Sequence, residues 1–212
     1  MAGIGIGPED FAIFEIDDPD ERADALERQV QPKLLSLGQQ IAAGLSRVAG
    51  KELHPHGAKA ARRRGAAPGE LLVAFSESPK GYRGYPFLAL AVSRNQLHAR
   101  VGVRGDSGRT AAMKRALERE AQNLARKGKP FRKLRQYLDW DQEQLPEVAP
   151  AHSAAFWQEV AQELAPAARG RLPGVDLGVA WSREEARSLA VGDVLGAFRD
   201  LAPLYKLLAN AD

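Results

Sequence analysis

The chain has 212 residues, of which 44% are hydrophobic and 27% are charged, values typical of a globular domain that folds without disulfides or metals. It contains no cysteine, which excludes disulfides, thiolate zinc sites and a cysteine nucleophile. No apolar run is long enough to span a bilayer, and the N-terminus lacks the basic and apolar regions of a signal peptide. We therefore expect a cytoplasmic protein with no membrane partner.

The net charge of +3 conceals an uneven distribution of charge along the chain. Residues 51–135 hold 20 Lys and Arg against 6 Asp and Glu, which leaves 10 basic and 21 acidic residues in the flanks. Such a basic middle indicates either a surface that faces an anion or charge pairing between the middle and the flanks.

The N-terminal part of the chain is expected to be mostly helical. Residues 1–10 are interpreted as a flexible N-terminus, because their glycines follow no strand that would make them a dinucleotide-binding loop. Residues 11–212 are interpreted as a single domain. Asp18 and Pro19 are typical of a helix start, and a stripe of apolar residues then continues to about Ala49. Pro32 is expected to kink or divide this helix.

The middle and the C-terminal part alternate between strands and helices. Strands are predicted at 70–76, 87–93, 96–103, 134–140 and 175–181, and helices at 108–127, 153–164 and 194–208. Arg94 and Asn95 form the turn of a hairpin, and Ser182 with Glu185 forms a capping box. The order of these elements predicts an α+β fold, with a mainly antiparallel sheet flanked by N-terminal and C-terminal helices.

The stretch from His54 to Pro86 holds most of the residue types that perform chemistry. Lys59, Arg62 and Arg63 are spaced to share one face of a helical turn, and arginine forks match the oxygens of phosphate or carboxylate groups. A second basic segment, residues 80–84, adds the Tyr82 ring for stacking and two glycines that let the backbone approach an anion. If the predicted strand 70–76 brings the chain back toward the first basic segment, both segments meet at one end of the sheet. The candidate anion-binding residues are His56, Lys59, Arg62, Arg63, Lys80, Gly81, Tyr82 and Arg83.

This stretch resembles the signature of the YktB-like family of uncharacterised bacterial proteins, the domain of unknown function 1054 or UPF0637 family. Its residues follow the family pattern H-x-A-K-x-A-R-R, a Pro-rich turn, an apolar strand and a final R-G-Y-K-x-x-P. Residues 11–33 and 198–205 resemble the opening and closing motifs of the family, so the resemblance extends from about Phe11 to Leu208. It implies a compact α+β domain and no specific activity.

Some positions depart from the family pattern. Ala60, Tyr85 and Phe87 stand where the family tends to carry histidines, and Arg83 replaces a lysine. A metal site or proton relay built on a histidine cluster is weakened by these changes, whereas the cationic part of the motif is retained.

Several alternatives to a simple anion site stay open. One alternative is an enzyme that acts on a small phosphorylated or carboxylated molecule. In it, His56 acts as a general base, and Lys59 and Arg62 hold the substrate. The basic residues also suit a nucleic-acid backbone, or a purely structural surface. Zinc binding by His54, His56 and His98 is disfavoured by the lack of a nearby acid, so we expect neither a metal nor a cofactor.

Overall fold

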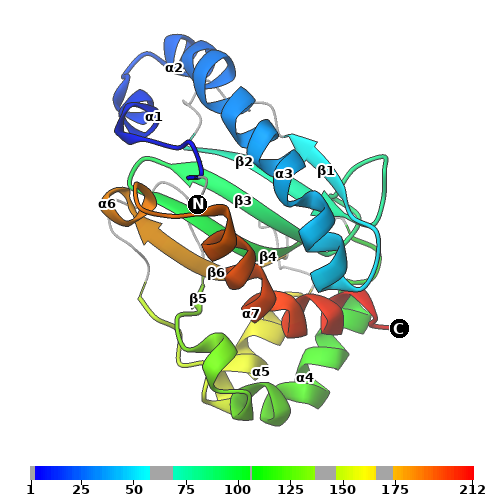
Figure 1. Ribbon diagram of the computed structural model, residues 1–212. Helices are drawn as coiled ribbons and strands as arrows, with labels where there is room; N and C mark the ends of the chain where they lie inside the picture. Colours follow the sequence, from blue (N-terminus) through cyan, green and yellow to red (C-terminus); the bar gives the residue numbers. More distant parts are fainter. Residues whose placement is uncertain (1–2, 58–68, 106, 137–146, 166–173) are drawn as a thin grey trace.

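A computed structural model describes residues 3–57, 69–105, 107–136, 147–165 and 174–212 (Figure 1). Its centre is a six-stranded sheet in the order β1-β2-β3-β4-β6-β5, in which all pairs of neighbouring strands are antiparallel. The strands are β1 His54–Gly57, β2 Glu70–Ser76, β3 Phe87–Ser93, β4 Gln96–Arg104, β5 Arg135–Gln136 and β6 Gly174–Ser182. The prediction of an α+β fold with an antiparallel sheet is confirmed.

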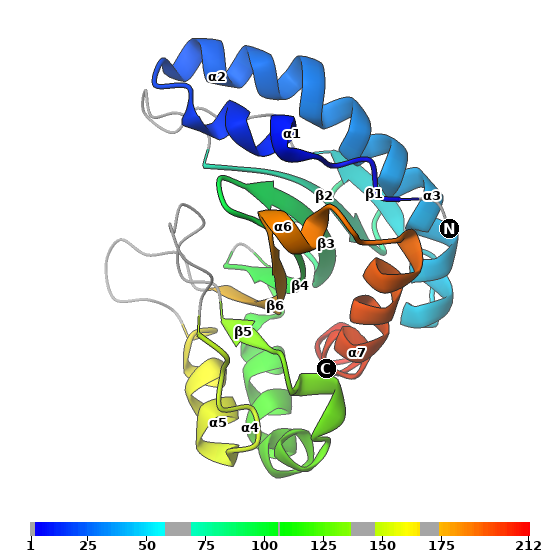
Figure 2. The ribbon, with the colours of Figure 1, turned by 60° about the vertical axis from the view of Figure 1, so that its left-hand side comes forward.

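One face of the sheet, here called the first face, is covered by helices α3 Gln31–Ala49 and α7 Val191–Ala209 (Figures 1 and 2). Alternate side chains of each strand point toward these helices, because successive residues of a strand face opposite sides of the sheet. The buried apolar residues on this side include Leu71, Val73, Phe75, Leu88, Leu90, Val92, Leu97, Ala99, Val101 and Val103. Helices α4 Thr110–Arg126 and α5 Ala154–Gln162 lie side by side beyond one end of the sheet.

The long N-terminal helix is interrupted in the region where the sequence predicted a kink. It consists of α2 Pro19–Ala25, the π-helical turn η2 Leu26–Val30 and α3. The wider π turn precedes Pro32, whose ring and missing N–H are incompatible with regular α-helical hydrogen bonding. The carboxylate of Asp18 accepts hydrogen bonds from the backbone N–H groups of Asp20 and Glu21 and caps the start. Gly50 ends the helix in the left-handed conformation, with φ of 76°.

Residues 4–6 are packed against the rest of the molecule through two isoleucine side chains. Ile4 and Ile6 belong to the buried core, and the Ile4 N–H donates to the Leu189 carbonyl over 3.3 Å. They lead into α1 Pro8–Ala12 and η1 Ile13–Glu15. The interpretation of residues 1–10 as a flexible terminus did not anticipate these contacts.

The remaining elements agree with the predictions in type and differ in extent. The chain also contains η3 Lys129–Phe131 and the short helix α6 Arg183–Ala186, which begins with the predicted capping box. β1 was not predicted, and the part of the predicted strand 134–140 that follows Gln136 lies outside the described residues. Pro203 lies inside α7 without ending it. Within the part of the chain that the structure describes, no helix has the length and apolarity required of a transmembrane span.

Candidate functional site

The opposite face of the sheet, here called the second face, is built from small and polar side chains. Its apolar part is a separate cluster made of Leu72, Ala74, Phe87, Ala89 and Ala91. Strand β4 contributes a row of polar side chains to the same face, and Gln96, His98 and Arg100 are each buried. Small neighbours leave room for these longer side chains to lie across the sheet.

Arg100 is the centre of a buried ionic group on the second face. Its Nη1 and Nη2 donate to Oε2 and Oε1 of Glu70 over 2.8 and 2.9 Å, which is the bidentate geometry that arginine favours with carboxylates. The Arg100 Nε lies 3.5 Å from Oδ1 of Asp176, and the His98 Nε2 lies 3.6 Å from Oε2 of Glu70. Carboxylates from β2 and β6 therefore converge on the guanidinium that β4 supplies.

Burial shifts the pKa values of two members of this group, Asp176 and His98. Desolvation raises the pKa of Asp176 to about 6, although the positive charges of Arg100 and Arg104 act in the opposite direction. The pKa of His98 is lowered well below 6.5 by burial and by the neighbouring Arg100 charge. His98 is consequently a neutral imidazole at physiological pH, whereas Asp176 changes its charge in the range where general acids and bases work.

His56 is held at the edge of the second face by the beginning of the 77–86 loop. Its Nε2 lies 2.9 Å from the Ser78 carbonyl oxygen and 3.3 Å from the Ser76 Oγ. Because a carbonyl oxygen only accepts, Nε2 is the donor in the contact with Ser78. Ser76 Oγ also donates to the Gly81 carbonyl over 3.0 Å, so the hydroxyl fixes the loop close to the imidazole.

Tyr82 connects this edge with the centre of the second face. The ring centroids of Tyr82 and His56 are 6.3 Å apart, and Tyr82 contacts Phe87 edge to face at 4.9 Å. On the other side, the Arg104 guanidinium lies 5.8 Å from the Phe87 ring centroid. An aromatic pair therefore lies between His56 and Arg104.

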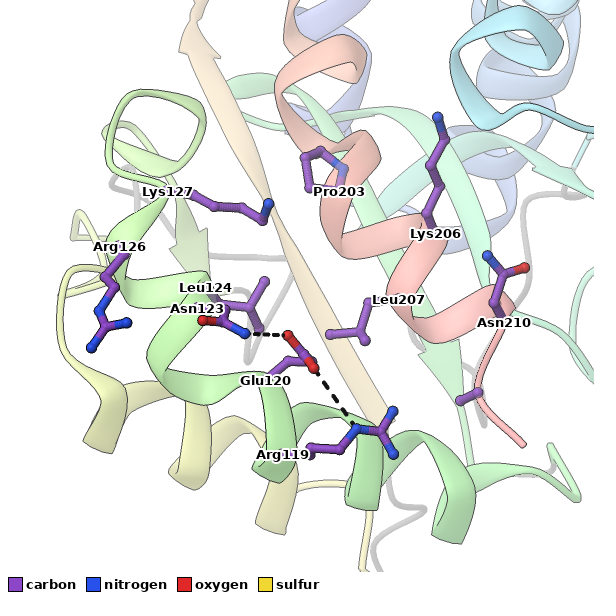
Figure 3. A pocket seen from close by; sticks show the side chains of 11 residues that line it. Arg119, Glu120, Asn123, Leu124, Arg126, Lys127, Pro203, Lys206, Leu207 and Asn210 are labelled. Carbon is purple, nitrogen blue, oxygen red and sulfur yellow. Dashed lines mark hydrogen bonds and ion pairs between the residues drawn. The ribbon is translucent and has the colours of Figure 1, made fainter.

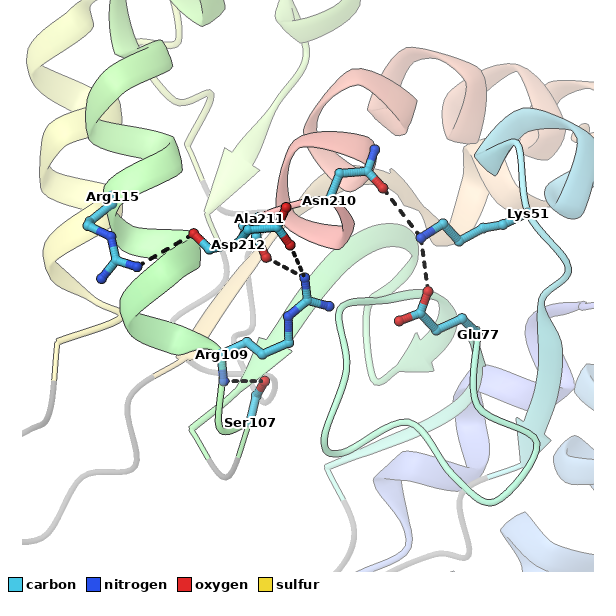
Figure 4. Close-up of polar contacts among 8 residues, drawn as sticks. All are labelled: Lys51, Glu77, Ser107, Arg109, Arg115, Asn210, Ala211 and Asp212. Atoms are coloured by element: carbon cyan, nitrogen blue, oxygen red, sulfur yellow. Dashed lines mark hydrogen bonds and ion pairs between the residues drawn. The ribbon is translucent and has the colours of Figure 1, made fainter.

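The 77–86 loop is anchored near both of its ends, and Figure 4 shows the anchor at Glu77. Glu77 pairs with Lys51 over 2.9 Å, and Lys51 also reaches the Asn210 side chain at 3.5 Å. Near the other end, Ser107 Oγ donates to the Gly84 carbonyl over 3.1 Å. These contacts hold the residues between them in a defined position relative to β1 and β4.

Lys80 and Arg83 project from this loop as exposed cations. Neither forms an ion pair with any residue that the structure describes, whereas Arg100 and Arg109 of the basic middle pair with Asp176 and Asp212 of the C-terminal flank. Pairing between the basic middle and the acidic flanks therefore does not involve these two cations within the described ranges.

The structure brings together only part of the predicted anion-binding set. His56, Gly81 and Tyr82 are neighbours, while Lys59, Arg62 and Arg63 lie outside the described residues. Segment 58–68 follows Gly57, which pairs with Val73, and rejoins the sheet at the start of β2. The 77–86 loop leaves the other end of β2, so the two basic segments are attached to opposite ends of this strand.

The three histidines considered for zinc do not converge. His54 and His56 lie on β1, while His98 lies on β4, three strands away in the sheet. At the usual strand spacing this separates their backbones by about 14 Å, too far for a shared ion. The groups of titratable side chains that the structure describes include no set with the geometry of a metal site.

The sequence analysis missed Glu70, Arg100 and Asp176. A signal existed, because Arg100 lies in the middle of a strand, in a row with Gln96 and His98 that alternates with Leu97, Ala99 and Val101. A charge at the centre of such a strand indicates a buried partner. The identity of that partner is not readable from spacing, because Glu70 lies 30 residues away in the sequence.

The fold and the second face define a small α+β protein with a buried ionic group beside a cationic loop. The chain belongs to the family described as a domain of unknown function (DUF1054), whose pattern matches residues 7–205. This confirms the resemblance found in the sequence.

Relatives with curated names share part of the chain. A UPF0637 protein of Bacillus velezensis is 39% identical over 92 residues, which cover 43% of this chain and 44% of the relative. A UPF0637 protein of Staphylococcus aureus strain N315 is 31% identical over 113 residues, with 53% and 55% covered. One of Staphylococcus saprophyticus is 36% identical over 96 residues, with 45% and 47% covered. The chain thus spans about half the length of the curated relatives it matches.

Proposed function

We propose that the protein binds a small phosphate-containing anion where the 77–86 loop meets the second face of the sheet. The observation that carries this proposal is that Lys80 and Arg83 are exposed, have no carboxylate partner among the described residues, and lie on an anchored loop. Cations held in place without a counter-charge favour an anionic ligand, because the ligand supplies the missing charge without reordering the loop.

The neighbouring groups suit the parts of such a ligand. Arg83 offers a planar fork for two phosphate oxygens, and Lys80 offers a point charge. A side chain built at Gly81 meets nothing within 4 Å, so a ligand is able to approach the backbone closely. Tyr82 is half-buried between His56 and Phe87, and its ring is available to stack on a flat group attached to the phosphate. Lys59, Arg62 and Arg63 lie on segment 58–68, which is attached to the opposite end of β2, so the proposed site does not depend on them.

A thermal-shift and calorimetric titration tests the proposal. Inorganic phosphate and a panel of nucleoside mono- and diphosphates are added to the wild type and to Lys80→Gln/Arg83→Gln. A ligand that binds only the folded state raises the melting temperature by mass action. We expect a phosphate compound to raise the wild-type melting temperature and to have at least tenfold weaker affinity for the double variant.

The matched control is Arg28→Gln/Arg47→Gln, which removes two exposed charges from η2 and α3. It should bind like the wild type. The proposal fails if no compound in the panel shifts the wild type at millimolar concentration, or if the control loses binding equally.

A second candidate function is catalysis on a small phosphorylated or carboxylated substrate. It is favoured by Asp176, a buried carboxyl whose pKa is raised to about 6 and which lies opposite Gly102 in the sheet. A general acid or base works best when its pKa is near the operating pH. Release of phosphate from a panel of phosphate monoesters is the measurement, and Asp176→Asn is expected to abolish turnover while ligand affinity stays within threefold. Equal turnover by the wild type and Asp176→Asn would refute the role of Asp176.

A further inference from the structure

The most basic part of the chain lies outside the stretch in which the sequence analysis placed its candidate site. Residues 109–135 contain ten Lys and Arg against two Asp and Glu, half of the 20 cations in the basic middle of the chain. In the structure these residues form α4, η3 and the beginning of β5. These elements contain neither Lys80 nor Arg83, which lie on the 77–86 loop.

A groove of about 750 Å³ runs between α4 and α7 (Figure 3). Exposed cations from both helices line it, namely Arg119, Arg126, Lys127 and Lys206. Glu120 is the one acidic side chain among its described lining residues, and it contacts Asn123 at 2.8 Å and Arg119 at 3.8 Å. The groove therefore carries a net positive charge.

The positive surface continues across the turn that follows α4. Lys129 and Arg132 are exposed and line an adjacent hollow of about 440 Å³. Arg126, Lys127 and Lys129 lie within four consecutive residues, which joins the hollow to the groove. We call this continuous patch the α4–η3 basic surface, made of Arg119, Arg126, Lys127, Lys129, Arg132 and Lys206.

These cations are poorly neutralised by the protein itself. Apart from the contact between Arg119 and Glu120, none of the six forms an ion pair with a residue in the described ranges, and Arg126 donates instead to the Gln122 side chain at 3.4 Å. Six like charges on one patch repel one another and destabilise the folded state. A multivalent anion bound there relieves this repulsion.

We propose that the α4–η3 basic surface binds nucleic acid through its phosphate backbone. Interfaces with nucleic acid are polar and strongly positive, whereas protein partners are usually anchored by buried aromatic or aliphatic side chains. The described residues that line the groove include no aromatic side chain. Val148, the only large hydrophobic residue that is exposed among those described, lines the adjacent hollow and not the groove. Because the groove offers cations and no aromatic ring, binding there is set by phosphates and is independent of base sequence.

Fluorescence anisotropy with labelled 20-nucleotide single strands and 20-base-pair duplexes of mixed sequence, at 50 to 200 mM KCl, tests this inference. The wild type is compared with Lys127→Gln/Lys206→Gln, which removes one cation from each side of the groove. We expect binding at 50 mM KCl that weakens steeply with salt. The variant should bind about tenfold more weakly, and its salt slope should be smaller by about 2, since each lost phosphate contact lowers the slope by about 1.

Two matched variants separate a defined surface from a general effect of charge. Arg28→Gln/Arg47→Gln removes the same net charge elsewhere and should bind nucleic acid like the wild type. Lys80→Gln/Arg83→Gln should also bind like the wild type, which makes the result independent of the anion site proposed above. Circular dichroism melting confirms that each variant is folded.

Three outcomes overturn the inference. These are no binding at 50 mM KCl, equal weakening in Arg28→Gln/Arg47→Gln, and displacement of the oligonucleotide by an equimolar poly-glutamate peptide. The last result assigns the surface to an acidic protein segment.

Discussion

Arg100 and Glu70 form a bidentate ion pair on the second face of the sheet, across β2, β3 and β4. The two hydrogen bonds measure 2.8 and 2.9 Å, the Arg100 side chain is fully buried, and that of Glu70 is 11% exposed. Removal of charges from water is costly, so such a pair is retained only if its geometry is good. It fixes how β2 and β4 lie relative to each other and positions Asp176.

Loss of the Glu70 charge is expected to destabilise the protein strongly. In Glu70→Gln the buried guanidinium loses its main counter-charge, and breaking a buried pair in this way costs about 3 kcal/mol. Urea unfolding at pH 7 measures this change. Glu27→Gln, which alters an exposed acid on η2, should change the free energy of unfolding by less than about 0.5 kcal/mol. Similar values for the two variants would show that the pair does not stabilise the fold.

Asp176 should make stability fall as the pH rises. Its pKa is about 6 in the folded state against an ordinary value of 3.8, so the folded state binds more protons than the unfolded state between these values. The penalty is absent below pH 3.8, grows as the pH rises and is complete above pH 6, where it reaches about 3 kcal/mol. Between pH 5 and pH 8 the unfolding free energy of Asp176→Asn should increase relative to that of the wild type by about 1.4 kcal/mol. A difference between the two proteins that does not change with pH would contradict the raised pKa.

His98 should make the stability of the protein fall as the pH falls, which is the opposite of the effect of Asp176. Because burial lowers its pKa in the folded state, the unfolded chain takes up a proton first as the pH falls below 6.5, and stability is lost there. The His98 ring protons are expected to keep the chemical shifts of a neutral imidazole from pH 8 down to pH 5.5 in NMR titrations. A midpoint at or above 6.5 would mean that the Glu70 carboxylate, 3.6 Å away, stabilises an imidazolium.

Gly102 is required by the packing of the second face. A Cβ built at this position overlaps the Phe87 ring and approaches the Asp176 carboxylate, so Gly102→Ala is expected to cost about 1 to 3 kcal/mol. At Gly196 in α7 an added Cβ meets nothing within 4 Å, and Gly196→Ala should stabilise the helix by up to about 1 kcal/mol. Thermal unfolding of both variants measures the two changes, and a stabilising effect of Gly102→Ala would show that the second face is loosely packed.

Local signals in the sequence determined most of the secondary structure. Asp18 and Pro19 start the N-terminal helix, Gly50 ends it, and Ser182 with Glu185 starts α6, because each of these residues satisfies backbone groups within a few positions of itself. Alternation of apolar residues likewise located β2, β3 and β4. The antiparallel arrangement followed from their short connections.

Only the tertiary structure decided what lies on the second face. His54–Gly57 contains Pro55 and lacks a strand pattern, and it forms β1 because β2 offers it an edge to pair with. The pairing of Arg100 with Glu70 and the contact of His56 with Tyr82 depend on strand register, which joins residues far apart in the sequence. The sequence by itself therefore determined the elements, the family and the excess of positive charge. The folded chain decided which charges are neutralised inside the protein and which stay exposed, because the distance between two side chains is set by packing and register.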